Sequence, residues 1–535
     1  QLRAELEGRG HRFHSQTDTE AIVHAYEEWG VACLQRFVGM FAFAIWDGRD
    51  QSVFVARDRL GKKPLFYHAA DGRLVFASEL KALLEHPGVP RELDLRALDD
   101  YLAYSYVPSD RCIFSGVQKL PPGHWLRWRD GALEVKRYWQ VDFRPGPALR
   151  EEEWAERVED ALRRSVRLRL RSDVPLGVFL SGGVDSSSIT ALAAQELGAP
   201  VKTFSIGFRH ADFDELRYAR LVADRYRTEH HELVVEDRDL SVLGSVAYHL
   251  DEPFGDPSAL PTYMVCREAR KHVTVCLSGD GADEVFAGYS RYREALDYAR
   301  LDALPAGARR FISDALRGVM PREAWGRGFV ERFGLSGVAR YFSQLSEFPA
   351  EERRALLAEH GPDLVSEGPR CFEACLDAPA DGLVGRLQLI DQRTYLPDDI
   401  LVKVDRTSMQ SSLEVRAPFL DHLLVELVNS APTSLKLRDG RGKHLLRRVL
   451  GPHLPAEVLE RRKMGFGVPI KHWFRGSMQD YARELLLSPD SRSKQFLSSA
   501  EIARTIEAHG RGMRDLSRRI WLLLMFEHWC RAYRV

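Results

Sequence analysis

The stretch GVFLSGGVDSSSITALAAQEL, residues 177–197, joins an apolar run to a helical pattern through a polar, glycine-rich turn. Its apolar start predicts a buried strand, and residues 186–197 predict a helix. Ser181, two glycines and Asp185 stand between them. A helix that opens directly after glycine-rich backbone presents unpaired amide groups and the positive end of its dipole. The turn therefore predicts a cradle for phosphate, with a tight turn whose polar residues cap the helix as the simpler alternative.

Two familiar motifs do not fit this turn. A Walker phosphate loop ends in Gly-Lys-Ser/Thr, and this sequence does not. The Gly-x-Ser-x-Gly elbow of serine hydrolases needs glycine where Phe179 stands, so Ser181 is not expected to be a nucleophile. Asp185 is poorly suited to contact phosphate directly. Its carboxylate does suit the Mg²⁺ that accompanies a nucleotide.

A second stretch, VTVCLSGDGADEVFAGY at residues 273–289, repeats the design. Its apolar strand ends in Ser278-Gly279 and is followed by the acids Asp280, Asp283 and Glu284. Open parallel sheets bind ligands outside the carboxyl ends of their strands, near the point where the strand order reverses. Two such strand ends predict one Mg-nucleotide site held between them.

The pattern along the chain changes near residue 145. The earlier residues form short strands joined by turns such as Asp71-Gly72, with few helices, which is typical of an α+β domain. Pro145, Gly146 and Pro147 mark a linker. Beyond it, continuous apolar strands alternate with helical patterns, which predicts a doubly wound parallel sheet. These strands are expected at residues 175–180, 201–208, 229–235 and 272–279, and the last part of the chain is mostly helical by pattern.

Composition sets limits on the function. The chain of 535 residues is long enough for two or three domains. Its 76 basic residues are balanced by 77 acidic ones, so no net positive charge favours nucleic acid. Seven scattered cysteines, none in a Cys-x-x-Cys pair, indicate reduced thiols and a cytoplasmic location. No run of about 18 apolar residues occurs. We expect neither a nucleic-acid nor a membrane partner.

The motifs together resemble a known family. LSGGVDSS resembles the pyrophosphate loop (PP-loop) of ATP pyrophosphatases. With SGDGADEVFAGY, YLPDDILVKVDRTSMQSSLEVRAPFLD and GKHLLRRVL, the chain resembles the glutamine-hydrolysing asparagine synthetase family. In the first half, QTDTEAIVHAYEEWG, FVGMFAFAIWD, ARDRLGKKPLFY and FASELKALLEHPGV resemble that family's glutaminase domain. The resemblance implies an incomplete α+β sandwich of N-terminal-nucleophile hydrolase type over residues 1–145. An α/β ATP-pyrophosphatase domain with helical additions is then expected over residues 146–535.

The resemblance also implies an activity. The expected enzyme is a ligase that amidates aspartate to asparagine through a β-aspartyl-AMP intermediate, using ATP and Mg²⁺. Its nitrogen is expected from glutamine in the complete protein and from ammonia in this chain. β-Lactam synthetases, peptide cyclases and amidotransferases of surface-polymer clusters share these motifs, so another carboxylate is an alternative. A tRNA-modifying pyrophosphatase and a non-catalytic binding remnant are weaker alternatives, because the net charge and the intact ATP motifs speak against them.

Site residues follow from the same resemblance. The pyrophosphate is expected at Ser181, Gly182, Gly183, Asp185 and Ser186, with Mg²⁺ on Asp185 and Asp283. The rest of the nucleotide is expected at Phe179, Ile206, Ser278 and Gly279. The catalytic candidates are Asp280, Arg406 and Lys443. Asp280 stands where some members have glutamate, and Arg406 where relatives carry lysine. Glu414 and Arg416 are either a structural ion pair beneath the site or part of it.

The front of the glutaminase domain departs from the family pattern. The family's domain begins with a cysteine activated by its own amino group, whereas this chain begins with Gln1. Because QLRAELEGRGHRF matches a later stretch of that domain, we expect its first part to be missing, and Cys33 has no free amine to replace the nucleophile. Asp18 matches the acid that takes the α-amino group of glutamine; it is also a candidate N-cap for a helix at residues 19–29. A homodimer is the assembly left open.

Overall fold

The computed structural model describes residues 2–108, 111–208, 215–235, 239–320, 326–366, 375, 378–461, 467–476 and 478–535. The chain divides into two compact units. The first comprises Gln1–Val89 and Gly116–Gln140, and the second comprises Pro90–Ser115 and Val141–Val535. The segment Pro90–Ser115 therefore belongs with the later part of the chain, and the functional boundary expected near residue 145 stays a prediction.

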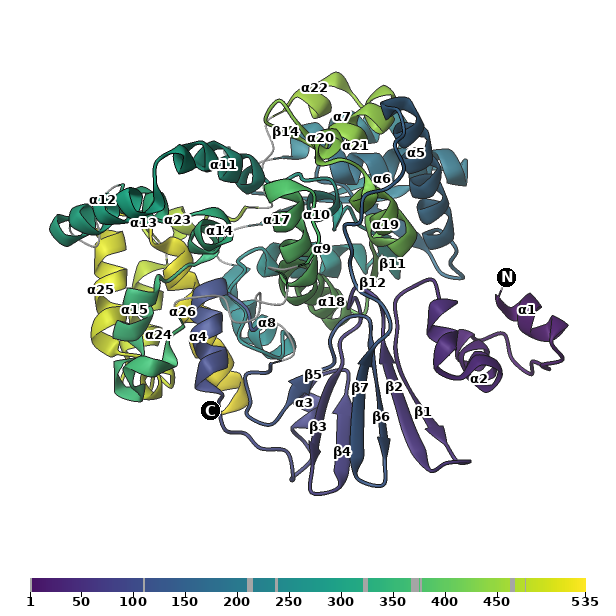
Figure 1. Cartoon of the computed structure of the whole chain (residues 1–535), viewed down its shortest axis with the longest axis horizontal. Helices are drawn as coiled ribbons and strands as arrows, with labels where there is room; N and C mark the ends of the chain where they lie inside the picture. Colours follow the sequence, from purple (N-terminus) through teal and green to yellow (C-terminus); the bar gives the residue numbers. More distant parts are fainter. Residues whose placement is uncertain are drawn as a thin grey trace. The chain divides into compact units, whose positions relative to one another are not determined.

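The first unit contains two antiparallel sheets (Figure 1). One has the order β1-β2-β6-β7, with β1 at Ala42–Asp47, β2 at Ser52–Arg57, β6 at His124–Arg129 and β7 at Ala132–Arg137. The other has the order β4-β3-β5, with β3 at Phe66–Ala70, β4 at Arg73–Ala77 and β5 at Gln118–Lys119. The expected turn joins β3 to β4, and Asp71 and Gly72 have the positive φ angles, 52° and 68°, that a tight two-residue hairpin demands. The α+β class expected for this region is confirmed.

Helices complete the first unit. They are α1 (Leu2–Gly8), α2 (Asp18–Trp29), the 3₁₀ helix η1 (Gly30–Gln35) and α3 (Leu80–Leu83). Leu6 and Tyr26 from the helices pack with Phe54 of β2 in one apolar core. One expectation needs correction here: the N-cap of α2 is Thr17, whose hydroxyl accepts from the amide of Glu20, and Asp18 is the first helical residue. The Thr17 hydroxyl precedes the helix and can therefore reach the free amides of its first turn, whereas Asp18 already lies inside the helix.

The second unit is built on a five-stranded parallel sheet. Its strands are β8 (Leu176–Phe179), β9 (Lys202–Phe208), β10 (Glu229–Val235), β11 (Val275–Leu277) and β12 (Glu414–Arg416), in the order β10-β9-β8-β11-β12. The chain runs outward from β8 to β10 and then returns to the other side of β8. The order thus reverses between β8 and β11, which confirms the doubly wound fold. The strand β12 was not expected from the sequence.

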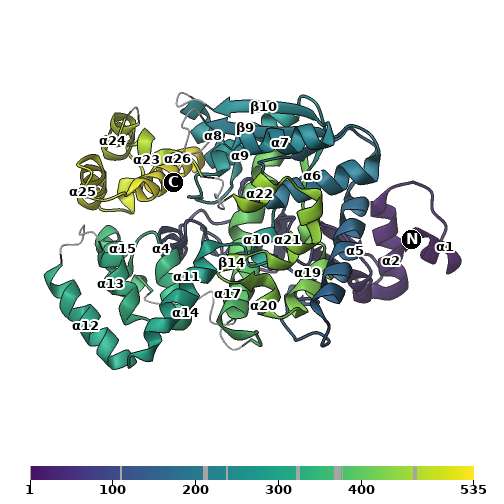
Figure 2. The same cartoon turned by 90° about the horizontal axis from the view of Figure 1, so that it is seen from above.

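Helices cover this sheet on both faces (Figure 2). One group has three helices: α5 (Glu151–Arg169) precedes β8, α6 (Val184–Leu197) follows β8, and α7 (Leu216–Tyr226) follows β9. They pack on one another and on β8, β9 and β10, because right-handed crossovers bring them to one side. The other group is α8 (Leu243–His249), α9 (Ala259–Ala269) and α18 (Leu401–Gln410), which pack together and reach β9, β10 and β12.

The helical additions are also present. Between β11 and β12 lie α10 (Ala282–Val285), α11 (Ser290–Ala299), α12 (Ala306–Val319), α13 (Arg327–Gly334), α14 (Gly337–Leu345), α15 (Ala350–Leu356), α17 (Gly382–Arg393) and the π-helical turn η8 (Leu396–Ile400). After β12 come α19 (His422–Ser430), α20 (Thr433–Lys436), β13 (Leu437–Arg438), β14 (Arg441–Gly442), α21 (His444–Leu450), α22 (Ala456–Glu460), α23 (Ile470–Trp473), α24 (Gln479–Leu487), α25 (Ser499–Gly510) and α26 (Ser517–Tyr533). Earlier in the chain, α4 (Leu95–Tyr104) joins this unit: the Tyr101 hydroxyl donates to the carbonyl of Leu522 in α26.

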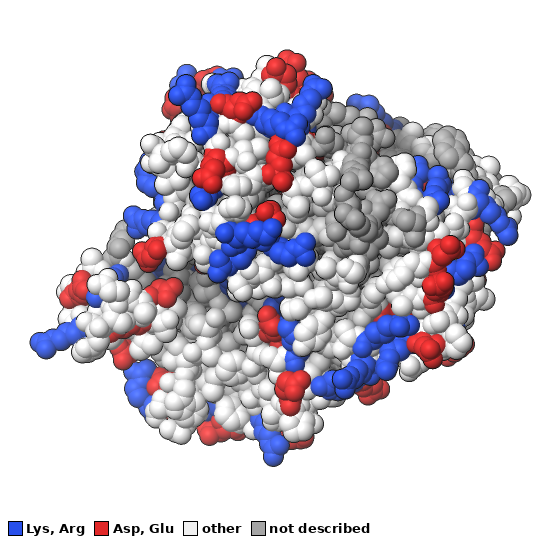
Figure 3. All heavy atoms as spheres, turned by 180° about the vertical axis from the view of Figure 1, so that it is seen from behind, with Lys and Arg blue, Asp and Glu red and all other residues white. Residues whose placement is uncertain are grey.

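Two features of the described residues concern the surface charge and the length of the helices. Among the described residues, acidic and basic side chains are intermingled on the face shown in Figure 3. None of the described helices combines the length and the apolar character needed to cross a membrane.

Candidate active site

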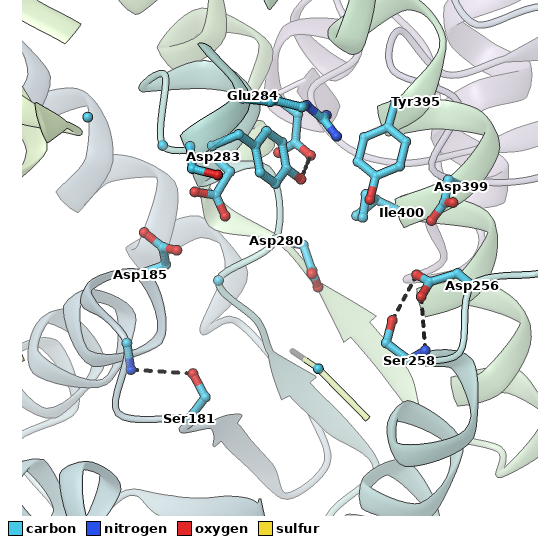
Figure 4. Close-up of a pocket in the computed structure, with 18 of the residues that line it drawn as sticks. Ser181, Asp185, Asp256, Ser258, Asp280, Asp283, Glu284, Tyr395, Asp399 and Ile400 are labelled. Atoms are coloured by element: carbon cyan, nitrogen blue, oxygen red, sulfur yellow. Dashed lines mark hydrogen bonds between the residues drawn. The ribbon is translucent and has the colours of Figure 1, made fainter. Parts of the chain in front are cut away.

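A cavity of about 1410 Å³ lies in the second unit, at the carboxyl ends of β8 and β11 (Figure 4). Ser181 from the loop after β8 and Asp185 from the start of α6 belong to its wall, as do Ser278 and Asp280 from the loop after β11 and Asp283 from the start of α10. Small-molecule pockets commonly measure about 300–1,000 Å³. The cavity therefore has room for a nucleotide and a second substrate at the switch point of the sheet.

The turn between β8 and α6 is shaped by glycine. Gly182 has a φ of 71°, and a Cβ at this position would lie 2.5 Å from the backbone nitrogen of Ala219 in α7. Gly183 is the N-cap of α6, and no side chain caps the helix there. Ser181 and Ser186 instead bond to each other: the Ser181 amide donates to the Ser186 hydroxyl at 3.1 Å. The serines hold the loop together, and the helix end is left without the side-chain cap of the simpler interpretation.

An ion triad connects the two turns. The Nζ of Lys443 lies 2.5 Å from Oδ2 of Asp185 and 2.6 Å from Oδ1 of Asp283. Burial favours a lower pKa for Lys443, but the two carboxylates outweigh burial and raise it. Gly288 packs against the triad, since an added Cβ would overlap Asp283 Oδ1 and Lys443 Cε. The close approach of this backbone requires glycine.

The two carboxylates of the triad fit Mg²⁺. Mg²⁺ prefers carboxylate oxygens, at about 2.0–2.1 Å. Asp185 comes from the start of α6 and Asp283 from the start of α10, and both already converge on one cationic atom within 2.6 Å. They are the residues that would hold the ion, and its charge would offset that of phosphate oxygens near the start of α6. Lys443 is the cation that shares these carboxylates.

Two further acids stand on the same wall. Asp280 points into the space between Asp185 and the far wall (Figure 4). Burial raises the pKa of Asp280, while the Ser278 hydroxyl and Lys403 partly counteract burial. Burial also raises the pKa of Glu284 to about 7, although its carboxylate accepts a 2.5 Å hydrogen bond from Tyr289. Both carboxyl groups are thus poised to take a proton more readily than exposed acids do.

The structure places Arg406 away from the cavity. Its side chain is buried and pairs with Asp251 at 2.5 Å. Lys403, three residues earlier in α18, lines the cavity and donates to Asp256 at 2.7 Å and to Ser258 at 2.9 Å. Three residues advance a helix by about 4.5 Å, which takes Arg406 beyond the cavity wall.

The other site residues predicted from the sequence are divided between those that line the cavity and those that do not. The cavity wall contains Phe179, Ser181, Gly183, Asp185, Ser186, Ser278, Gly279, Asp280, Asp283 and Lys443. Gly182 shapes the turn without lining the cavity, and Ile206 is buried in β9 away from the wall. Asp18 is exposed at the start of α2 in the first unit.

Several wall residues were not singled out from the sequence. Basic ones include Arg441, Arg447 and Arg461, and the far wall carries Asp256, Tyr395 and Asp399 (Figure 4). Arg447 lies one helical turn after Lys443 in GKHLLRRVL, so helical spacing could have indicated it. Tyr395 directly precedes the π-helical turn η8 and Asp399 lies within it; such turns are common at functional sites. Arg461, which donates to the carbonyl of Gly182 at 3.2 Å, carried no signal.

Glu414 and Arg416 form an ion pair on β12. The Nε of Arg416 lies 2.6 Å from Oε1 of Glu414, and the guanidinium also donates to the carbonyls of Arg169 and Arg171. Neither side chain is part of the cavity wall. Of the two interpretations, the structural ion pair is the one present.

Comparison with known proteins is consistent with this architecture. The family model described as asparagine synthase matches residues 157–531, and the model described as a glutamine amidotransferase domain matches residues 1–139. A solved structure of the allosteric regulatory enzyme of purine biosynthesis covers 44% of this chain and 57% of its own at 15% identity. Its TM-score of 0.20 is too low to define the fold.

Curated relatives match the chain almost from end to end. Asparagine synthetase [glutamine-hydrolyzing] 1 of Bacillus subtilis (strain 168) is 34% identical over 99% of this chain and 83% of its own length. A putative asparagine synthetase [glutamine-hydrolyzing] of Mycobacterium tuberculosis (strain ATCC 25618 / H37Rv) is 38% identical, covering 99% and 82%. Amidase chyE of Penicillium rubens is 27% identical over 91% and 78%. The family models and the first two relatives establish that the chain belongs to the glutamine-hydrolysing asparagine synthetase family.

Proposed function

We propose that this chain amidates aspartate to asparagine at the cost of ATP, releasing AMP and pyrophosphate. The names of its relatives support this activity. The structural observation that carries the proposal is the convergence of Asp185, Asp283 and Lys443 between the ends of β8 and β11. This triad gathers the charges that a Mg-nucleotide requires at the place where doubly wound sheets bind ligands.

The proposed reaction proceeds in two steps, adenylation of the carboxylate and attack by ammonia. A carboxylate is a poor acylating agent, so the β-carboxylate of aspartate first attacks the α-phosphorus of ATP and pyrophosphate leaves. Ammonia then attacks the acyl carbon of β-aspartyl-AMP, loses a proton, and AMP leaves with the bond electrons. Both steps depend on positioning and on charge neutralisation at the phosphates.

The wall residues have distinct proposed roles. The first turn of α6 and the loop tied by Ser181 and Ser186 bind pyrophosphate. Lys443 neutralises phosphate charge. Phe179, Ser278 and Gly279 contact the rest of the nucleotide. Asp280 stands beside the acyl-adenylate, where its raised pKa suits a group that exchanges a proton with the incoming amine.

The nitrogen supply belongs to the same proposal. In a protein that carries the family's N-terminal cysteine, glutamine hydrolysis would deliver ammonia, with Asp18 binding the α-amino group of glutamine; for this chain, which begins with Gln1, ammonia is the proposed nitrogen donor. Ammonia added directly serves the second step equally, because that step needs only the neutral amine. The protein is proposed to be cytoplasmic, with a homodimer as the assembly to test.

The test follows asparagine and AMP together. The chain is incubated with aspartate, ATP, Mg²⁺ and ammonium, and equal amounts of both products are expected. We expect Asp185→Asn to lower AMP formation at least ~100-fold, because one charged oxygen donor to Mg²⁺ is lost. Its melting temperature should stay close to that of the parent, since Asp185 lies on a cavity wall.

Asp173→Asn is the matched control, because Asp173 is exposed in the loop before β8. It should leave AMP formation unchanged. Near-parental AMP formation in the Asp185 variant would refute the assignment of the triad.

A second candidate is amidation of a different carboxylate. One observation favours testing it: an amidase is among the relatives. The same assay is run with a panel of carboxylic acids in place of aspartate. AMP formation with another acid and none with aspartate would replace the first proposal with the second.

A further inference from the structure

A compact group of histidine and carboxylate side chains lies in the first unit, outside the cavity described above. His11 follows α1, while His24 and Glu27 stand three residues apart on α2, whose place is shown in Figure 1. Their positions on α2 put the last two on one helix face. The segment between α1 and α2 brings His11 across to meet them.

The three ligand atoms are separated as ligands of one metal ion would be. Nδ1 of His11 lies 3.2 Å from Nδ1 of His24 and 3.7 Å from Oε2 of Glu27. The remaining side of the triangle, from His24 Nδ1 to Glu27 Oε2, measures 2.8 Å. Ligands about 2.0–2.1 Å from a tetrahedral Zn²⁺ lie about 3.4 Å apart, so the triangle brackets the required spacing.

The opposite ring nitrogens face carboxylates. Nε2 of His11 lies 3.2 Å from Oε2 of Glu28, and Nε2 of His24 lies 3.7 Å from Oε1 of Glu20. These carboxylates are themselves fixed: Arg9 donates to Glu28 at 2.9 Å, and the amides at 14 and 15 donate to Glu20 at 2.6 Å. A carboxylate that holds one ring nitrogen of a metal-bound histidine leaves the other nitrogen free of its proton for the metal. Glu28 is within hydrogen-bond distance of His11 for this role, whereas Nε2 of His24 makes no hydrogen bond and only faces Glu20.

The surroundings suit a bound cation with access from solvent. The histidine side chains are only 16% and 17% exposed, whereas Glu27 is 49% exposed and opens the group to water. The Phe13 ring packs edge-on against His24 and limits its movement. Glu20 and Glu28 lie beside the group, and Glu28 also pairs with Arg9.

We propose that His11, His24 and Glu27 bind one Zn²⁺, with a solvent molecule as the fourth ligand. Two imidazole nitrogens and one carboxylate oxygen form a donor set that suits zinc. The ion would tie the segment after α1 to the face of α2.

The experiment uses the full chain, freed of metal with a chelator. Zn²⁺ is titrated calorimetrically in excess Mg²⁺, which occupies the carboxylates of the nucleotide site. We expect one Zn²⁺ per chain, a rise in melting temperature on binding, and the visible absorption of tetrahedral Co²⁺ when that ion replaces zinc. His11→Gln and His24→Gln should each abolish the binding of this Zn²⁺ ion, and Glu27→Gln should weaken Zn²⁺ binding about 10–100-fold.

The matched control is His14→Gln, because His14 lies exposed in the same segment. This variant should bind Zn²⁺ as the parent does. Aspartate-dependent AMP formation with ammonium is measured in parallel and should not change in any of the four variants, so that failure of this proposal is distinct from failure of the proposed function. Less than one equivalent of Zn²⁺ bound by the parent, or Zn²⁺ binding in both histidine variants as strong as in the parent, would overturn the proposal and leave a hydrogen-bonded histidine pair.

Discussion

Lys443 occupies a strained position that the surrounding structure enforces. Its φ of 61° lies in the left-handed region, where a residue with a side chain costs of order 1 kcal/mol or more. The amide of Lys443 donates to the carbonyl of Phe286 at 2.9 Å, and its ammonium binds Asp185 and Asp283. These contacts fix the residue at the N-cap of α21 and aim its side chain at the ends of β8 and β11.

Helix α18 carries two cationic side chains with different surroundings. Lys403 faces the cavity beside Asp256, and Arg406 is buried against Asp251. We expect Lys403→Arg to lower AMP formation at least ~10-fold, because a longer, planar cation replaces a point charge on the cavity wall. Arg406→Lys should keep AMP formation within about threefold, since it preserves the buried charge pair. Steady-state kcat and KM for aspartate, with urea midpoints, check both variants.

A third variant, Arg406→Met, separates an effect on folding from an effect on activity. Arg406→Met should cost about 3–5 kcal/mol of unfolding free energy, because Asp251 is left charged and buried. If Arg406→Lys raised the KM for aspartate while the urea midpoint stayed constant, Arg406 would touch substrate and the role inferred from the sequence would be restored.

Among the elements, the turn between β8 and α6 depends most on glycine. Gly182 and Gly198 flank α6 and have similar φ angles, 71° and 61°. A Cβ at Gly182 would collide with α7, whereas one at Gly198 would meet nothing within 4 Å. Gly198→Ala should therefore cost only about 1 kcal/mol for the dihedral strain. Gly182→Ala should cost more and should also lower AMP formation at least ~10-fold, because the phosphate loop must shift.

Thermal unfolding and the AMP assay on both alanine variants measure this difference. If the two variants lost equal stability and kept full activity, the turn before α6 would tolerate a Cβ at Gly182. Its close approach to α7 would then have no role in nucleotide binding.

The end of α20 carries a lysine that responds to pH. Lys436 is fully buried and its ammonium lies 4.8 Å from the centre of the Phe143 ring. Burial lowers the pKa of Lys436 to about 7, with a partial offset from Asp381. In the unfolded chain the amine keeps its proton up to about pH 10.4. Between these values the unfolded state binds the extra proton, so stability rises with pH.

Lys436→Met should remove this dependence. We expect the unfolding free energy of the parent to rise relative to that of the variant by about 2–4 kcal/mol between pH 7 and pH 10. Urea titrations at intervals across this window test the prediction, with Lys136→Met, exposed on β7, as the control. Parallel pH profiles for the parent and the Lys436 variant would contradict it.

For the whole molecule, the second unit needs a helix from the first part of the chain. Asp99 of α4 pairs with Arg353 at 2.6 Å, both buried, and Tyr101 bonds to α26. Tyr104 from the end of α4 lines the cavity. A fragment of residues 146–535 lacks this helix, so we expect it to aggregate or to melt without a cooperative transition. The loss of the buried Asp99–Arg353 pair alone costs about 3–5 kcal/mol.

Calorimetry and AMP formation of this fragment are the measurements. Asp99→Ala in the full chain is the milder control and should lower the melting temperature without removing activity. A cooperative, active fragment would show that residue 145 is an independent folding boundary.

Much of the fold was predictable because its signals are local. Strands buried on both faces read as continuous apolar runs, and Asp71-Gly72 marks a hairpin by its dihedral preferences alone. The motifs at Ser181 and Ser278 follow such strands, so their meeting at one edge follows from a parallel sheet. The sequence by itself therefore determined the two fold classes, the family resemblance and the edge of the sheet where the cavity lies.

Only the tertiary structure decided which side chains meet. Lys443 contacts Asp185 across 258 residues, a pairing that no local pattern encodes. The choice between Lys403 and Arg406 depends on where α18 passes the cavity, and α4 joins the later unit because its buried face fits there. The short edge strand β12 was missed because three residues give too little periodicity. Local preference determines elements, whereas the contacts of a site depend on the packing of elements distant in the chain, and that packing is the property of the folded molecule.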